Sequence, residues 1–106
     1  MDAAAIQSIF DRTIEEATTR AGVKLGRGNE FALPELTKNA AQFVSKTTDQ
    51  RAQSLLIMQG IAAYESLVAD MVRAASTIEN YPPGIIGEDT FDLAKQYRGG
   101  PMPPWW

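Results

Sequence analysis

Residues 50–80 read QRAQSLLIMQGIAAYESLVADMVRAASTIEN, and this stretch decides the fold. At about 100° per residue, the polar side chains of its central part fall within one narrow stripe: Gln59, Ser66, Asp70, Arg73 and Thr77. The sequence Tyr81-Pro82-Pro83-Gly84 follows and ends the element, because a residue before proline resists the helical conformation. We therefore predict one long helix at about residues 50–80.

The predicted long helix is apolar on two sides. Its broad face is expected to make the main core contact and holds Leu56, Ile57, Gly60, Ala63, Tyr64, Leu67, Val68, Met71, Ala74, Ala75 and Ile78. A second flank holds Met58, Ile61, Ala62, Glu65, Ala69, Val72 and Ser76. A helix that is apolar around most of its circumference is normally covered by its surroundings.

The rest of the chain predicts three shorter elements around this helix. One amphipathic helix at about residues 2–21 is capped by Asp2, and another at about 34–46 begins with Pro34 in its first turn. A glycine-rich loop joins them, with a short extended piece at residues 23–25. A last helix at about 88–98 has acidic residues at its positive end. The fold class is therefore all-α, a small bundle of three to four helices.

The connection between helices 34–46 and 50–80 has two interpretations. Thr47 and Gln50 have the spacing of a capping box, which predicts a break near residues 46–49. Alternatively, one helix runs from Pro34 to about Asn80. We favour the break.

Residues 1–98 form one predicted domain, and residues 99–106 form a proline-rich arm that ends in both tryptophans. Prolines bias such an arm toward an extended conformation, and tryptophans are enriched at binding hot spots. Three interpretations stay open for the arm: it packs on this chain's own helices, it docks on a neighbouring protein, or it is disordered. Its candidate binding residues are Pro103, Pro104, Trp105 and Trp106.

Composition removes several kinds of chemistry. The 106 residues include no histidine and no cysteine, so the commonest general base, thiol nucleophile and transition-metal ligands are missing. Two acidic pairs lie one turn apart, Asp11 with Glu15 and Glu88 with Asp92, but we expect both to be solvated rather than to hold a cation. We therefore expect no enzyme activity, no cofactor and no metal site.

The charge of the chain limits the classes of partner that we expect. Ten basic residues are scattered among thirteen acidic ones and give a net charge of −3, which argues against nucleic acid. The longest segment without a charge, residues 52–64, is too short and too polar to span a bilayer. The N-terminal residues do not resemble a secretory signal. We expect a cytoplasmic protein without a membrane span, and export without a signal stays compatible with the sequence.

Glu65 is the one carboxylate on the apolar flank of the long helix. Three interpretations compete for it: a solvated position at the edge of the flank, a pair with an arginine such as Arg12 or Arg20, or a catalytic role.

The predicted short helices offer little surface to cover the flank of helix 50–80. We therefore expect a non-enzymatic interaction or assembly subunit, which forms a homo-oligomer or docks on another protein through this helix and the arm. The candidate contact residues on the helix are Met58, Ile61, Glu65, Ala69 and Val72. In the alternative, the C-terminal segment folds back over the flank and the protein stays monomeric. A different function, an acidic inhibitor or immunity-type protein, would use acidic residues such as Asp11, Glu15, Glu88 and Asp89 to bind one target enzyme.

Overall fold

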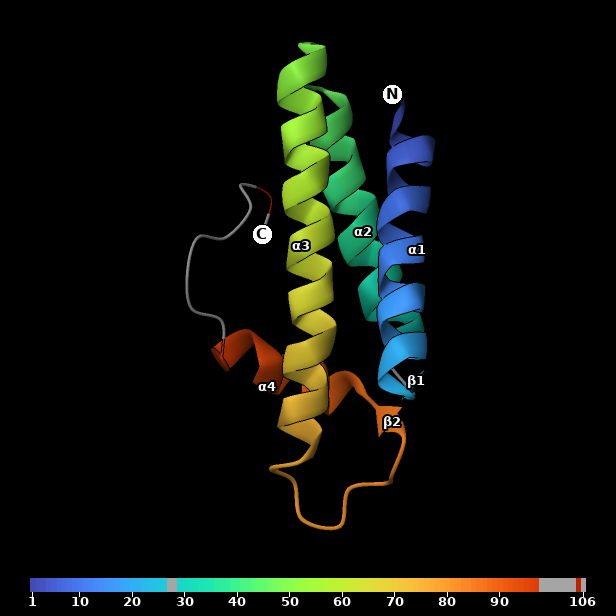
Figure 1. Ribbon diagram of the computed structural model, residues 1–106, viewed down its shortest axis with the longest axis vertical. Helices are drawn as coiled ribbons and strands as arrows, with labels where there is room; N and C mark the ends of the chain where they lie inside the picture. The colour runs from blue at the N-terminus through green and yellow to red at the C-terminus, as the bar shows by residue number, and fades with distance from the viewer. Residues whose placement is uncertain (27–28, 98–104, 106) are drawn as a thin grey trace.

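Three helices stand side by side along the long axis of the molecule, and a fourth crosses their lower end (Figure 1). The computed structural model describes residues 1–26, 29–97 and 105, with the backbone alone at residues 29–32. The helices of this part are α1 (Ala3–Ala21), α2 (Asn29–Ser45), α3 (Gln50–Ala75) and α4 (Glu88–Tyr97). Two short strands, β1 (Lys24–Leu25) and β2 (Ile85–Ile86), complete it. The prediction of a small all-α bundle is confirmed.

Helix α1 packs along both α2 and α3, whereas α4 packs mainly against α3. The core is built from one face of each helix and from β2, with these large side chains fully buried: Ile6, Phe10, Val44, Tyr64, Leu67, Val68, Met71 and Ile86. Four of them come from the broad apolar face of residues 50–80 that the sequence assigns to the core. The assignment of this face to the core is therefore confirmed. Burial of its apolar side chains away from water favours the folded state.

Helix α1 forms as its sequence predicts. The Asp2 side chain accepts a hydrogen bond from the Ala5 backbone N–H at 2.8 Å and so caps the helix. Gly22 ends it with φ 71°, a left-handed conformation that a side chain would disfavour. The inward stripe of Ile6, Phe10 and Ile14 is buried.

Helix α2 begins at Asn29, five residues before the predicted start at Pro34. Pro34 therefore lies inside the helix, where its ring nitrogen cannot donate the usual hydrogen bond. Two interactions stabilise this turn: Leu33 is buried in the core, and the Thr37 hydroxyl shares its one proton between the Asp11 carboxylate at 2.7 Å and the Pro34 carbonyl at 3.1 Å. Tertiary packing thus overrides the local preference of proline for a helix start.

The helix is interrupted between α2 and α3 at residues 46–49, which is the interpretation favoured from the sequence. The predicted capping box of Thr47 and Gln50 is wrong, because Asp49 caps α3 by accepting from the Arg51 N–H at 3.0 Å. Gln53 also holds this corner: its buried side-chain amide donates to the carbonyls of Val44 and Thr47 at the end of α2. These bonds tie the first turn of α3 to the C-terminal end of α2, where the Val44 carbonyl also accepts from the Thr47 N–H at 3.0 Å.

Helix α3 ends at Ala75, earlier than the predicted residue 80. The hydroxyls of Ser76 and Thr77 donate to the carbonyls of Arg73 and Ala74 at 2.6 and 2.7 Å. Backbone N–H groups after Ala75 bond three residues back instead of four, which tightens the chain into turns. The side-chain hydroxyls of Ser76 and Thr77 therefore end the helix before the chain reaches the prolines.

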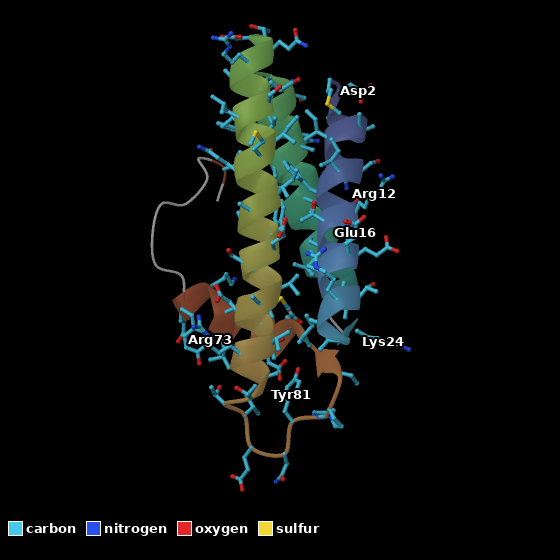
Figure 2. All side chains as sticks on the ribbon, in the orientation of Figure 1. Asp2, Arg12, Glu16, Lys24, Arg73 and Tyr81 are labelled. Atoms are coloured by element: carbon cyan, nitrogen blue, oxygen red, sulfur yellow. The ribbon has the colours of Figure 1, made fainter. Side chains whose placement is uncertain are left out.

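The two strands join the ends of α1 and α3. They pair in parallel, Lys24 with Ile85 and Leu25 with Ile86, which confirms an extended piece after the first helix. Tyr81 fixes the following loop: its hydroxyl donates to the Asp89 carboxylate at 2.7 Å and accepts from the Gly87 N–H at 2.9 Å. Figure 2 places Tyr81 at the lower end of α3. Helix α4 is thereby held at its N-terminal end.

Candidate interaction surface

A row of exposed side chains runs along the side of α3 opposite the core. We call it the outward face of α3 and define it as Leu55, Met58, Ala62, Glu65, Ala69 and Val72. The first five are exposed and Val72 is half-buried. Leu55 and Met58 keep 57% and 64% of their surface in contact with solvent, which is unusual for large apolar side chains on neighbouring turns. In the described part of the chain, Leu55, Met58, Ala62 and Ala69 stay exposed, whereas Val72 packs against the core and Glu65 pairs with α1.

The flank expected from the sequence contains four exposed residues of this row, Met58, Ala62, Glu65 and Ala69. It also includes Ile61, which the structure turns into a groove between α1 and α3, and Val72, which lines a hollow beside Tyr81 and Ile85. Leu55 was missed. A signal for it exists, because Leu55 lies three residues before Met58 and seven before Ala62, the spacing of one helix face.

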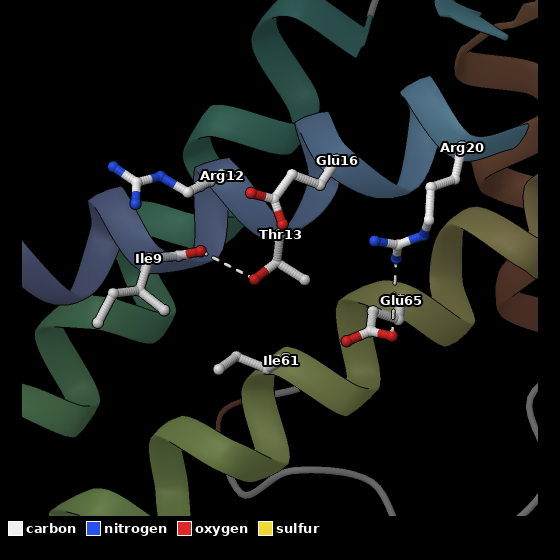
Figure 3. A pocket seen from close by; sticks show the side chains of 7 residues that line it. All are labelled: Ile9, Arg12, Thr13, Glu16, Arg20, Ile61 and Glu65. Carbon is white, nitrogen blue, oxygen red and sulfur yellow. Dashed lines mark hydrogen bonds and ion pairs between the residues drawn. The ribbon is translucent and has the colours of Figure 1, made fainter. Parts of the chain in front are cut away.

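Glu65 lies at the edge of the outward face and interacts with α1. Its carboxylate is 3.8 Å from the Arg20 guanidinium, and the two side chains are 50% and 62% exposed (Figure 3). Both the solvated and the arginine-paired interpretations are therefore partly right, with Arg20 as the partner. An exposed pair of this kind contributes less than about 1 kcal/mol to folding.

The groove beside this pair separates α1 from α3. It encloses about 250 Å³ and is lined by Ile9, Arg12, Thr13, Glu16, Arg20, Ile61 and Glu65 (Figure 3). The Thr13 hydroxyl donates to the Ile9 carbonyl at 2.9 Å, so the polar atom at the floor is satisfied within its own helix. The groove therefore presents an apolar floor with charges at its rim, and it extends the outward face of α3 toward α1.

Trp105 packs on the chain's own helices. Its ring stacks on Phe10 with centroids 6.1 Å apart and lies 5.9 Å from the ring of Phe43. This agrees with the interpretation that the arm folds back, as far as Trp105 is concerned. The covered surface lies beside Gly60, on the inner side of α3, so Trp105 leaves the outward face free. Pro103, Pro104 and Trp106 lie outside the described residues.

The acidic side chains form no metal site in the described ranges, where no group of three or more Asp or Glu side chains could hold an ion. Asp11 accepts a hydrogen bond from the Thr37 hydroxyl at 2.7 Å, and Asp89 accepts from Tyr81. Two of the four acidic residues suggested for an inhibitor are therefore engaged within the protein.

Helix α3 has the length and hydropathy that a membrane span requires, and it is the only such helix in the described part. It is longer than the charge-free segment 52–64. One such helix is weak evidence, because the core helix of a water-soluble bundle passes the same test. The inner face of α3 packs against α1 and α4, as that of a core helix does.

No protein-family model, curated protein or solved structure matches the chain.

Proposed function

We propose that this protein is a non-enzymatic assembly subunit, which associates with other protein chains through the outward face of α3. The observation that supports this most is the exposure of Leu55 and Met58 on neighbouring turns of this face. Contact with another protein would remove these side chains from water, and apolar burial is the main driving force of association.

Other classes of function find less support. Catalysis would have to proceed without histidine or cysteine. Among the described residues, no group brings together the carboxylates that a divalent metal needs. An acidic inhibitor would need free carboxylates on one surface, but Asp11 and Asp89 accept hydrogen bonds from Thr37 and Tyr81. An assembly role requires neither catalytic groups nor a surface of free carboxylates.

The proposal is tested by the mass of the protein in solution. Size-exclusion chromatography with light scattering is expected to show a dimer or larger species at concentrations on the order of 100 µM, since small interfaces give weak complexes. The substitution Met58→Glu should shift the protein to a monomer, because it would bury a charge at the contact. Gln59→Glu is the matched control: it adds the same charge at an exposed neighbouring residue outside the outward face, and it should leave the mass unchanged.

Two further measurements complete this test. Circular dichroism and thermal unfolding of Met58→Glu should match those of the parent protein, because Met58 makes little contact within the chain. Removal of residues 101–106 should weaken association if the arm contributes to it. A monomer at all concentrations, indifferent to both the substitution and the truncation, would contradict the proposal.

A further inference from the structure

The outward face of α3 has the spacing of a seam between two helices. Its residues 55, 58, 62, 65, 69 and 72 are separated alternately by three and four positions. A repeat of seven residues with this alternation keeps one straight row facing a second helix, as in a coiled coil. The row spans 18 residues, about 27 Å at 1.5 Å per residue. The geometry therefore fits a helix better than a loop or a sheet as the occupant.

The size of the side chains changes along the row. Leu55 and Met58 are large and lie near the start of α3, whereas Ala69 is small and the following Val72 is half-buried. An antiparallel copy of the same helix would place Leu55 opposite Val72, Met58 opposite Ala69, and Ala62 opposite Glu65. Each projecting side chain would then meet a small or recessed one, and a two-fold axis would repeat the match. A parallel copy would stack the large residues on each other and leave a gap between the alanines.

The charges along the row also favour the antiparallel orientation over the parallel one. Arg51, seven residues before Met58, is exposed on the same row as Glu65. A parallel copy would bring Arg51 opposite Arg51 and Glu65 opposite Glu65, and such like-charge contacts oppose association. In the antiparallel register, Arg51 faces Ser76 at the C-terminal end of the other α3, where the helix dipole favours a cation. Glu65 then faces Ala62, and the two Glu65 side chains lie three positions, about 4.5 Å, apart along the axis, each with Arg20 of its own chain 3.8 Å away to balance its charge.

We infer that the outward face of α3 is occupied by a second copy of this chain, packed antiparallel with Met58 opposite Ala69. The inference rests on the proposed function and adds the partner, the orientation and the register. A parallel dimer would place the two Glu65 carboxylates at the same level, whereas the antiparallel register offsets them along the axis.

Single cysteines can measure this register, because the natural chain contains none. The variants Met58→Cys and Ala69→Cys are mixed in equal amounts, oxidised mildly and analysed by intact mass. The antiparallel register predicts the mixed 58–69 disulfide in about tenfold excess over either symmetric product, since a disulfide requires Cα atoms within about 7 Å. Two copies of residue 58 would lie eleven residues apart along the axis, about 16 Å. Gln42→Cys, exposed on α2, replaces Met58→Cys in the control for random collision.

The possible outcomes separate the inference from the proposed function. A dominant mixed disulfide, above the Gln42 control, supports the inference. Symmetric 58–58 and 69–69 products would overturn the antiparallel orientation, while loss of association in Met58→Glu would still support an assembly surface. Crosslinking no stronger than in the control would overturn the second copy as the occupant. Circular dichroism of each cysteine variant verifies that both replaced residues, exposed in the structure, leave the fold intact.

Discussion

At Gly60, the aromatic ring of Phe10 from α1 packs directly against the backbone of α3. A methyl group at this position would overlap the Cε1 and Cζ atoms of Phe10 and would lie 3.2 Å from the Trp105 ring. The absence of a side chain therefore lets Phe10 reach the backbone of α3. At this point the sequence shows only a glycine in a helix, which by itself is unfavourable.

We expect Gly60→Ala to lower the free energy of unfolding by about 1–2 kcal/mol. Alanine gains about 1 kcal/mol of helix propensity, but the overlap with Phe10 forces side chains or helices to shift, which costs more. Urea unfolding followed by circular dichroism measures the change. The control repeats Gly60→Ala in a Phe10→Leu background, because the smaller side chain leaves room. If the alanine costs as much in that background as in the parent protein, the overlap is not the cause.

Tyr81 links the loop before β2 to the start of α4, and its ionisation opposes folding. Partial burial, and then the hydrogen bond that its hydroxyl donates to Asp89, raise the pKa of Tyr81 above its ordinary value of about 10. Since the folded-state pKa is the higher one, the stabilisation is fully present below pH 10 and is lost as pH rises through the folded-state pKa.

The variant Tyr81→Phe tests this dependence. At pH 7 we expect it to lower the free energy of unfolding by about 1 kcal/mol, because the hydroxyl bonds both Asp89 and the Gly87 N–H. The difference between parent and variant should shrink as the pH is raised above 10. Thermal unfolding of both proteins between pH 7 and 11 measures it, and subtraction removes the contribution of the other tyrosines and lysines. A difference that stays constant with pH would contradict the role of the hydroxyl proton.

At the scale of elements, Trp105 joins the three long helices. Its ring contacts Phe10 of α1 and Phe43 of α2 and lies beside Gly60 of α3, and Phe43 remains 42% exposed even so. The indole N–H is buried without a hydrogen-bond acceptor among the described residues. Trp105 therefore stabilises the bundle through apolar contact, while its N–H finds no acceptor in the part of the chain that the structure describes.

This balance predicts different effects for two substitutions. Trp105→Ala should lower the free energy of unfolding by about 2 kcal/mol, because apolar contact is lost and a hollow remains. Trp105→Phe should change it by less than about 1 kcal/mol, since the loss of area is offset by removal of the unsatisfied N–H. Chemical denaturation at a low protein concentration measures both. If Trp105→Ala left the folded monomer unchanged and weakened only its association, Trp105 would act on a neighbouring molecule instead.

Helix boundaries were predictable where the signals are local. Asp2 and Gly22 bracket α1 because a carboxylate cap and a left-handed glycine act within one turn. The start of α2 was not predictable in the same way, because Pro34 normally marks a first turn and only burial of Leu33 against the other helices extends the helix backward. The early end of α3 is an intermediate case: Ser76 and Thr77 are visible in the sequence, but their bonds to α3 carbonyls compete with continued helix.

At the scale of the whole molecule, the bundle is elongated, with extents of 48 × 25 × 21 Å. Three helices cannot surround one another fully, so each keeps an outer side, and polar residues cover the outer side of α1. On α3 that side carries Leu55, Met58 and the small alanines instead. Exposed apolar side chains in one row of a helix favour contact with another protein, which supports both the assembly proposal and its antiparallel register.

Hydrophobic periodicity and caps act over short distances, so the helical class, the central helix and most of its buried face are predictable from the sequence. The sequence also identified an uncovered flank and the candidate partners of Glu65. The packing of the helices sets which flank residues remain exposed, selects Arg20 as the partner of Glu65, and places Trp105 beside Gly60. Those outcomes depend on how helices distant in sequence pack together, and no local pattern specifies the angle or depth of that packing.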